Sequence, residues 1–228
     1  MSEESMSRGG RLRPPDLDLR CYLVTSGTGR RTVEVAADAA AAGAGVVQVR
    51  AKDASTTELL ELVLAVADAV HAANTATAVL VDDRADVAWA ARRRGAPVAG
   101  VHLGQDDLPV ADARELLGED AVIGLTTGTL DLVRAAESLS EHLDYLGAGP
   151  FRRTPTKDSG REPLGVAGYA PLLAASSLPI VAIGDVTPAD VPALAQVGVA
   201  GTALVRAVMD AADPAAVVRE VLAGHAGR

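Results

Sequence analysis

Residues 45–83 read GVVQVRAKDASTTELLELVLAVADAVHAANTATAVLVDD, and they contain the clearest structural pattern in the chain. Short apolar runs at 45–49 and 78–81 flank a stretch at 56–73 in which Ala, Leu and Val recur at helical spacing. A strand, a helix and a second strand in this order predict two parallel strands joined by a right-handed crossover. Because both runs are largely apolar on their two faces, we expect helices to cover the outside of the sheet.

The same alternation of short apolar runs and longer Ala-rich stretches continues on both sides of this unit. Further strands are expected at 20–24, 100–103, 121–124, 144–147, 180–183 and 201–205. Further helices are expected at 32–42, 86–94, 109–117, 130–138, 166–174, 188–197 and 214–222. Eight strand–helix units can form an open doubly wound sheet or a closed barrel. The count of eight, with polar residues after nearly every strand, favours an α/β fold with a single domain, a (β/α)8 TIM barrel over residues 19–228.

Composition and charge exclude several classes of protein. The 228 residues carry a formal net charge of −9 and only 2% aromatic side chains, which argues against a general nucleic-acid-binding surface. No apolar run is long enough to cross a bilayer. Cys21 is the single cysteine, so an intramolecular disulfide is excluded and a reducing, cytoplasmic compartment is expected. Residues 1–18 lack an apolar core and predict a disordered N-terminal leader, not a signal peptide.

Two cations and an amide follow the strand expected at 45–49. Alternation along an extended chain points Gln48, Arg50 and Lys52 to one side and Val49 to the other. Arginine presents a planar fork to oxygen atoms and lysine a mobile point charge, so this set suits a phosphate or a diphosphate. For either cation taken alone, a solvated charge at a strand end is the alternative.

Acidic residues follow the third and fourth expected strands, as Asp82, Asp83 and Asp86 after one and Asp107 after the other. One carboxylate from each loop would make a Mg2+ site, because this ion takes one or two protein carboxylates together with water and substrate oxygens. For Asp86 and Asp107 the alternative is a place near the N-terminus of the following helix, where negative charge is favourable. His102 is a lone histidine beside an apolar strand, and we assign it no catalytic role.

The longest expected loop, residues 147–160, follows the sixth strand. Its glycines allow the backbone to approach a ligand, and Thr154, Thr156 and Lys157 add hydroxyls and a charge. Loops of this length are usually functional or disordered, and a mobile lid with solvated charges is the alternative. In barrels the loops after the seventh and eighth strands often bind phosphate, so we expect a second anion site there.

Together, four segments resemble the thiamine-phosphate synthase family, and the likeness extends along nearly the whole chain. In chain order they are QVRAK at 48–52, DDRAD at 82–86, HLGQDD at 102–107 and GPFRRTPTK at 149–157. Each follows an expected strand, so the set is more specific than any one segment. The resemblance implies a Mg2+-dependent enzyme that couples 4-amino-2-methyl-5-hydroxymethylpyrimidine diphosphate with thiazole monophosphate. The products would be thiamine monophosphate and pyrophosphate, formed by a dissociative substitution.

The resemblance also implies roles for individual residues. The catalytic residues would be Arg50, Lys52 and Lys157, and Asp83 and Asp107 would hold Mg2+. The substrate-binding residues would be Gln48, Arg50, Lys52, Asp82, Thr126, Thr154, Thr156, Lys157, Asp185, Val205 and Arg206. Of these, the two threonines of the long loop would meet the thiazole, and the last three would lie near its phosphate. The expected partners are two small-molecule substrates, with no nucleic acid and no membrane, and the sequence allows a homo-oligomer.

Two positions depart from the family pattern. Asp82 stands where the family usually has Asn, and the extra anion could bind metal more strongly or repel diphosphate. Asp185 replaces the second Gly of a Gly-Gly turn, and Arg206 is a candidate to compensate its charge beside a phosphate. Two other functions stay open: a barrel resembling thiazole tautomerase, and a noncatalytic protein that binds a thiamine precursor. The diphosphate-binding and acidic residues argue against the tautomerase, which has no diphosphate to hold.

Overall fold

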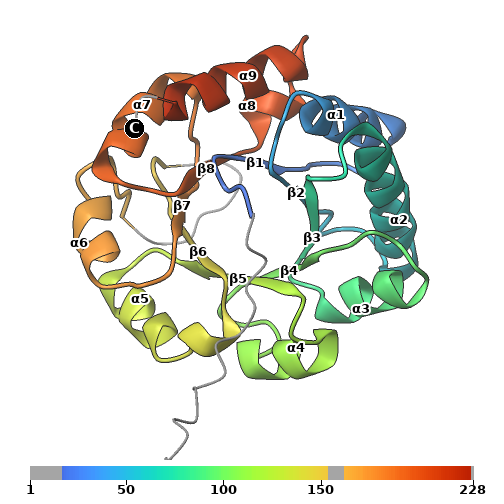
Figure 1. Ribbon diagram of the computed structural model, residues 1–228, viewed down its shortest axis with the longest axis horizontal. Helices are drawn as coiled ribbons and strands as arrows, with labels where there is room; N and C mark the ends of the chain where they lie inside the picture. Colours follow the sequence, from blue (N-terminus) through green and yellow to red (C-terminus); the bar gives the residue numbers. More distant parts are fainter. Residues whose placement is uncertain (1–16, 154–161, 227–228) are drawn as a thin grey trace, which may run out of the picture.

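The computed structural model describes residues 17–153 and 162–226, and within them eight parallel strands close into a barrel (Figure 1). The strands are β1 (Cys21–Val24), β2 (Val46–Val49), β3 (Ala78–Asp82), β4 (Gly100–Leu103), β5 (Val122–Thr127), β6 (Tyr145–Ala148), β7 (Ile180–Ala182) and β8 (Gly201–Leu204). Each strand pairs with the next one in the sequence, and β8 pairs with β1. The predicted (β/α)8 barrel is confirmed, and the open sheet is wrong.

The helices form a ring around the barrel (Figure 1). They are α1 (Arg30–Ala41), α2 (Thr56–Ala73), α3 (Ala85–Arg93), α4 (Val110–Leu117), α5 (Leu130–Glu137), α6 (Tyr169–Ala174), α7 (Val191–Val197), α8 (Arg206–Met209) and α9 (Pro214–His225), with 3-10 turns η1 (Ser140–His142) and η2 (Pro188–Asp190). The longest, α2, has the bounds expected from the sequence. It begins with a capping box, in which Ser55 and Glu58 each accept a hydrogen bond from the other's backbone N–H.

Differences from the sequence-based expectation are clearest at α6, α7 and α8. The helix expected at 166–174 begins only at Tyr169, because Pro171 fits a first helical turn and not a helix interior. The helix expected at 188–197 divides into η2 and α7, whose first turn contains a proline. The single turn α8, directly after β8, is absent from the expectation because four residues are too few to show helical periodicity.

Alternation along each strand divides the core into two layers. The larger cluster lies between the barrel and the helices and includes Leu23, Val47, Val81 and Leu146. The smaller cluster lies inside the barrel and consists of Leu19, Tyr22, Val24, Val46, Leu80, Val122, Tyr145, Val181 and Ala203. Side chains therefore fill the barrel interior up to the strand ends, where polar residues take over.

Most of the predicted leader lies outside the described residues, which begin at Leu17. Leu17 packs against the inner cluster, and the Asp18 carboxylate accepts hydrogen bonds of 2.8 and 3.0 Å from the Arg20 guanidinium. The boundary at residue 18 stays a prediction. Throughout residues 17–153 and 162–226, no helix is both long and apolar enough to cross a membrane.

A buried ion pair between Arg114 of α4 and Asp144, the residue before β6, lies at the end of the barrel where the strands begin. Arg114 Nη2 lies 3.1 Å from Asp144 Oδ2, and both side chains are 4% exposed. The same carboxylate accepts a 2.7 Å hydrogen bond from the backbone N–H of Ile123, while Arg114 Nη1 donates to the Ala121 carbonyl over 2.5 Å. The pair thus holds the starts of two neighbouring strands together.

Replacing Arg114 with leucine would leave the Asp144 carboxylate buried without its cation. Because removal of one partner of a buried ion pair costs about 3–5 kcal/mol, the free energy of unfolding should fall by about that amount. Urea denaturation followed by circular dichroism measures the change. Arg134→Leu is the control, since Arg134 and Asp131 form an exposed pair at 3.9 Å whose loss should barely move the midpoint. Equal midpoints for the two variants would contradict the prediction.

Candidate active site at the carboxyl ends of the strands

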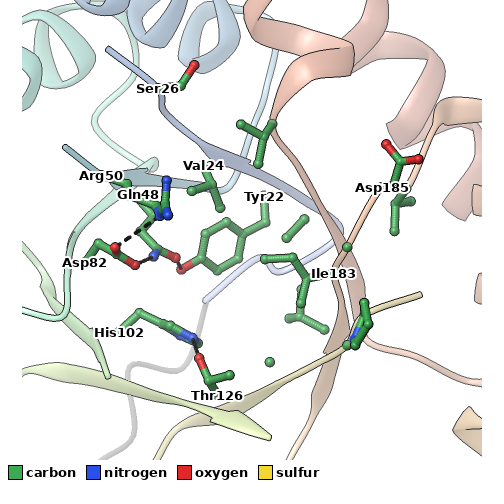
Figure 2. A pocket seen from close by; sticks show the side chains of 18 of the residues that line it. Tyr22, Val24, Ser26, Gln48, Arg50, Asp82, His102, Thr126, Ile183 and Asp185 are labelled. Atoms are coloured by element: carbon green, nitrogen blue, oxygen red, sulfur yellow. Dashed lines mark hydrogen bonds and ion pairs between the residues drawn. The ribbon is translucent and has the colours of Figure 1, made fainter. Parts of the chain in front are cut away.

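A cavity of about 550 Å3 opens at the end of the barrel where the strands finish (Figure 2). Every strand, or the loop directly after it, contributes lining residues. Because the strands are parallel, their carboxyl ends and the loops that follow meet at this one face. The cavity has the size of a small-molecule site and lies where barrel enzymes carry their active sites.

Two cations and two carboxylates occupy one side of the cavity. Arg50 Nε lies 3.4 Å from Asp82 Oδ2, and Lys52 Nζ lies 3.0 Å from Asp83 Oδ2. The Arg50 side chain is 29% exposed and the Lys52 side chain 45% exposed, so a ligand in the cavity can reach both cations. Gln48, which alternation placed on the same side of the strand as these cations, also lines the cavity.

Asp83 and Asp107 converge from two neighbouring loops. The Asp107 carboxylate accepts a 2.6 Å hydrogen bond from the backbone N–H of Gly104. A Cβ built on Gly104 would lie 2.8 Å from Asp107 Oδ2 and 3.9 Å from Asp83 Oδ1, so both carboxylates lie over this residue. Burial raises the pKa of Asp107, and the negative charge of Asp83 adds to the rise. Because these like charges repel, a cation bound between them would be stabilised.

Asp82, the last residue of β3, faces Gln48 and Arg50. Burial raises the pKa of Asp82 to about 6, with a further contribution from the charge of Asp83 and opposition from Arg50. At neutral pH the carboxylate is therefore mostly ionised. Its two oxygens face the Gln48 amide, which donates from Nε2, and the Arg50 guanidinium. An amide donor and a cation thus balance the negative charge that Asp82 adds.

For Asp86 and Asp107, the alternative to metal binding was a place near a helix N-terminus. The structure bears out this alternative for one of them and not for the other. Asp86 lies in the first turn of α3 and forms a 2.6 Å ion pair with Arg84, as that alternative predicts. For α4 the N-cap is Pro109, without a capping side chain, and the acid in its first turn is Asp112. Asp107 therefore lies outside α4, and its carboxylate stands over Gly104 beside Asp83.

A chain of hydrogen bonds crosses the floor of the cavity, partly visible in Figure 2. Gln48 Nε2 donates to Asp82, and the Tyr22 hydroxyl donates to Gln48 Oε1 over 2.6 Å. The hydroxyl oxygens of Tyr22 and Tyr145 are 2.7 Å apart. Burial raises the pKa of both phenols far above the ordinary value, so each keeps its proton.

His102 extends this chain to the opposite wall. Its Nδ1 lies 2.8 Å from the Tyr145 hydroxyl, and its Nε2 lies 2.9 Å from the Thr126 hydroxyl. Figure 2 shows the His102 ring directed at Thr126. The sequence assigned this histidine no catalytic role, and the structure makes it a buried link in a polar network.

Sequence reasoning missed Tyr22 and Tyr145. Both stand on apolar strands, where an aromatic residue is usually part of the core. Alternation along β1 and β6 could have shown that each side chain points into the barrel. The meeting of their hydroxyls depends on the register of non-adjacent strands, for which the sequence offers no signal.

The opposite side of the cavity contains Asp185 and Arg206. Asp185 Oδ1 and Arg206 Nη2 are 2.5 Å apart, and both residues line the cavity with Val205. Asp185 has a φ of 59°, in the left-handed region that favours glycine. Arg152 Nη1 donates to the Asp185 carbonyl over 3.1 Å. The loop after β7 therefore keeps the backbone of a glycine turn while an arginine pairs the added carboxylate.

Three of the site residues expected from the sequence, Thr154, Thr156 and Lys157, lie outside the described residues. Nine of the others line one cavity: Gln48, Arg50, Lys52, Asp82, Asp83, Thr126, Asp185, Val205 and Arg206. Asp107 is not among the lining residues, but its carboxylate lies beside that of Asp83 over Gly104.

Comparison with known proteins reveals a family. The sequence model described as "Thiamine monophosphate synthase" matches residues 21–208. The chain is 58% identical over 211 residues to "Thiamine-phosphate synthase" of Corynebacterium efficiens, which covers 92% of this chain and 96% of that one. It is 42% identical over 229 residues to the protein of the same name from Anaeromyxobacter dehalogenans, covering 100% of this chain and 96% of the relative.

A solved structure agrees with this result. The thiamine phosphate pyrophosphorylase from Pyrococcus furiosus superimposes with a TM-score of 0.76 at 28% identity, covering 92% of this chain and 96% of that one. The likeness therefore covers the barrel and not an isolated motif.

The left-handed backbone of Asp185 leads to a stability prediction. Asp185→Gly and Asp185→Ala both remove the ion pair with Arg206. They differ in the backbone, because only glycine adopts a φ of 59° without steric cost. The glycine variant should be more stable than the alanine variant by about 1 kcal/mol, although alanine normally gains from a less flexible unfolded chain. Thermal unfolding of the two proteins in parallel measures the difference, and a more stable alanine variant would refute it.

Proposed function

This chain belongs to the thiamine monophosphate synthase family, and we propose that it couples 4-amino-2-methyl-5-hydroxymethylpyrimidine diphosphate with thiazole monophosphate to form thiamine monophosphate and pyrophosphate. The observation that carries the proposal is the cluster of Arg50, Lys52, Asp83 and Asp107 at the strand ends. Cations and converging carboxylates in one cavity are what a metal-bound diphosphate requires.

The first substrate would lie against β2 and β3. Gln48 would contact the pyrimidine, while Arg50 and Lys52 would bind the diphosphate oxygens. Their ion pairs with Asp82 and Asp83 hold both cations at the cavity wall before a ligand arrives. Thr126 and Lys157 would complete the diphosphate contacts, as the family resemblance implies.

Catalysis in this family is metal-assisted, and we propose Mg2+ as the ion. Asp83 and Asp107 fit this ion, because two repelling carboxylates lie over Gly104. Within the described residues, no group of three or more His, Cys, Asp or Glu could hold a metal. Two protein carboxylates are sufficient for Mg2+, since water and substrate phosphate oxygens supply its other ligands. When bound, the ion would neutralise negative charge on the diphosphate.

The residues suit a dissociative substitution. When the bond between the methylene carbon and the diphosphate oxygen breaks, negative charge accumulates on pyrophosphate and positive charge on the pyrimidine methylene. Arg50 and Lys52 would stabilise the leaving group through charges that stand at the cavity wall before the reaction, and the family resemblance assigns the same role to Lys157. The thiazole nitrogen attacks with its own lone pair, so this chemistry needs no general base.

The second substrate would lie near β7 and β8. Its phosphate would approach Asp185, Val205 and Arg206, and its ring would meet Thr154 and Thr156. The contact between Asp185 and Arg206 supports this assignment, because the arginine pairs the carboxylate that would otherwise repel a phosphate. The proposed enzyme acts on small molecules, and we expect it in the cytoplasm.

One assay tests the proposal through the acidic pair. Asp83→Asn and Asp107→Asn should each lower turnover by about 100-fold or more, because a lost carboxylate weakens the metal site at the leaving group. Thiamine monophosphate and pyrophosphate are followed after mixing both substrates with Mg2+. Asp106→Asn is the control, since Asp106 is an exposed neighbour with no proposed role.

The same assay distinguishes the alternatives. Wild-type turnover in the Asp83 variant would remove that residue from the metal site. Ligand affinity without product in the wild-type protein would replace the synthase with a noncatalytic binding protein. Isomerisation of the thiazole phosphate alone would indicate a tautomerase.

The second substrate site has its own prediction. Arg206→Gln should raise the KM for thiazole phosphate about tenfold, which corresponds to about 1.4 kcal/mol, and leave the KM for the pyrimidine diphosphate unchanged. Arg219→Gln on α9 is the control, because Arg219 makes only an exposed contact, 3.9 Å from Asp213. An unchanged KM for thiazole phosphate would show that Arg206 does not bind its phosphate.

A further inference from the structure

The hydrogen-bond chain on the cavity floor has a fixed direction, and Asp82 sets it. One Asp82 oxygen faces the Arg50 guanidinium and the other accepts a hydrogen bond from Gln48 Nε2, so the amide nitrogen of Gln48 is the atom that faces Asp82. The amide oxygen then faces Tyr22, whose hydroxyl donates to it over 2.6 Å. The reverse orientation would place the Gln48 oxygen against a carboxylate oxygen, which is repulsive.

The orientation of Gln48 also decides which group donates at each hydrogen bond of the two tyrosines. A phenol has one hydrogen, and that of Tyr22 is already donated to Gln48. Across the 2.7 Å contact the donor must therefore be Tyr145. With its own hydrogen used, Tyr145 can only accept from His102, which places a proton on Nδ1 of the imidazole. At the other side of the ring, Nε2 lies 2.9 Å from the Thr126 hydroxyl.

Glycines make the space that this chain needs. A Cβ at Gly124, an inward position of β5, would overlap the Tyr145 ring. At Gly147, an inward position of β6, a Cβ would lie 3.0 Å from His102 Cε1. The barrel interior therefore has room for the two rings because two inward positions carry no side chain.

After its contacts with Asp82 and Tyr22, the Gln48 amide has one hydrogen-bond donor and one acceptor left for a ligand. It has two N–H groups and two oxygen lone pairs, and Asp82 and Tyr22 use one of each. One donor and one acceptor remain, on an amide that cannot turn over without losing both contacts. Gln48 lines the cavity, so a ligand meets this donor and acceptor in a fixed order.

We propose that Tyr22, Tyr145 and His102 are positioning residues that, with Asp82, lock the Gln48 amide in one orientation, and that this orientation selects an aminopyrimidine over an oxopyrimidine. An aminopyrimidine edge offers an amino N–H and a ring-nitrogen lone pair, which match the amide oxygen and the amide N–H. An oxopyrimidine offers a carbonyl oxygen and a ring N–H in the same places, so both contacts become repulsive. The inference rests on the proposed function, because it concerns the pyrimidine substrate of that reaction.

Tyr22→Phe and Tyr145→Phe test the lock by removing one hydroxyl each. The measured quantity is the ratio of kcat/KM for the 4-aminopyrimidine diphosphate to that for its 4-oxo analogue. In Tyr22→Phe the ratio should fall about tenfold or more, because the unlocked amide can accommodate either edge. Tyr145→Phe should lower the ratio less, since Tyr22 keeps its contact with Gln48. In both variants the KM for thiazole phosphate should stay at the wild-type value.

Tyr169→Phe is the matched control. Tyr169 is fully buried and its hydroxyl donates to the Ala148 carbonyl over 2.9 Å, but it belongs to the outer core and not to the chain. Its loss should lower stability without changing the ratio. The proposal is overturned if Tyr22→Phe keeps the wild-type ratio, or if it raises the KM of both substrates as a general loosening of the barrel would.

His102 provides a rescue test. His102→Leu removes the donor to Tyr145, whereas His102→Asn can place an N–H near the position of Nδ1. The asparagine variant should recover the amino-to-oxo ratio better than the leucine variant, and equal ratios would remove His102 from the lock.

Calorimetric binding of the 4-aminopyrimidine diphosphate and its 4-oxo analogue separates this inference from the proposed function. Preferential binding of the amino form that weakens in Tyr22→Phe would support the lock even in the absence of turnover. Turnover in the wild type with no preference between the two forms would keep the function and overturn the lock.

Discussion

The pairing of β8 with β1 is the contact on which the rest of the structure depends. It aligns Cys21 with Thr202 and Tyr22 with Ala203, and it closes eight parallel strands into one barrel. Gly201 allows this closure, because a Cβ there would overlap the Leu19 carbonyl. Since a parallel barrel has all its carboxyl ends on one face, closure alone gathers loops that are distant in the sequence around a single cavity. In an open sheet, the polar side chains on β2 and those after β8 would not surround a common interior, and they would not line one cavity.

Closure also sets the electrostatics of the cavity. Arg50 and Lys52 bring positive charge to a face on which Asp82, Asp83 and Asp107 would otherwise repel one another. In this ligand-free arrangement Lys52 is paired with Asp83. On the proposed function, a metal ion on Asp83 would take over the role of that ammonium and release Lys52 to the diphosphate. The ion pair between Lys52 and Asp83 is partly exposed to solvent, so breaking it would cost little free energy.

The sequence was sufficient for the barrel but not for the polar network inside it. Repeated apolar runs and helical spacing locate all eight strands, since these patterns reflect burial of one element at a time. The single turn α8 and the start of α6 at Tyr169 escape such patterns, because they depend on a few residues and on a proline. Among site residues, those just after strands are recognisable as polar breaks in apolar runs. Tyr22 and Tyr145 are not, because their hydroxyls acquire a role only when β1 and β6 face each other across a closed barrel.

The two aspartates that depart from the family pattern illustrate the same dependence on context. Judged by charge alone, each would oppose a phosphate. Asp82 instead faces Gln48 and Arg50, so an amide donor and a cation in the cavity wall balance its negative charge. Asp185 preserves a glycine-like backbone at a φ of 59° and is paired with Arg206, a residue on the neighbouring loop after β8. A phosphate arriving there would compete with Asp185 for the same guanidinium. Phosphate affinity at this site would therefore depend on the difference between two contacts to Arg206 and not on the strength of either.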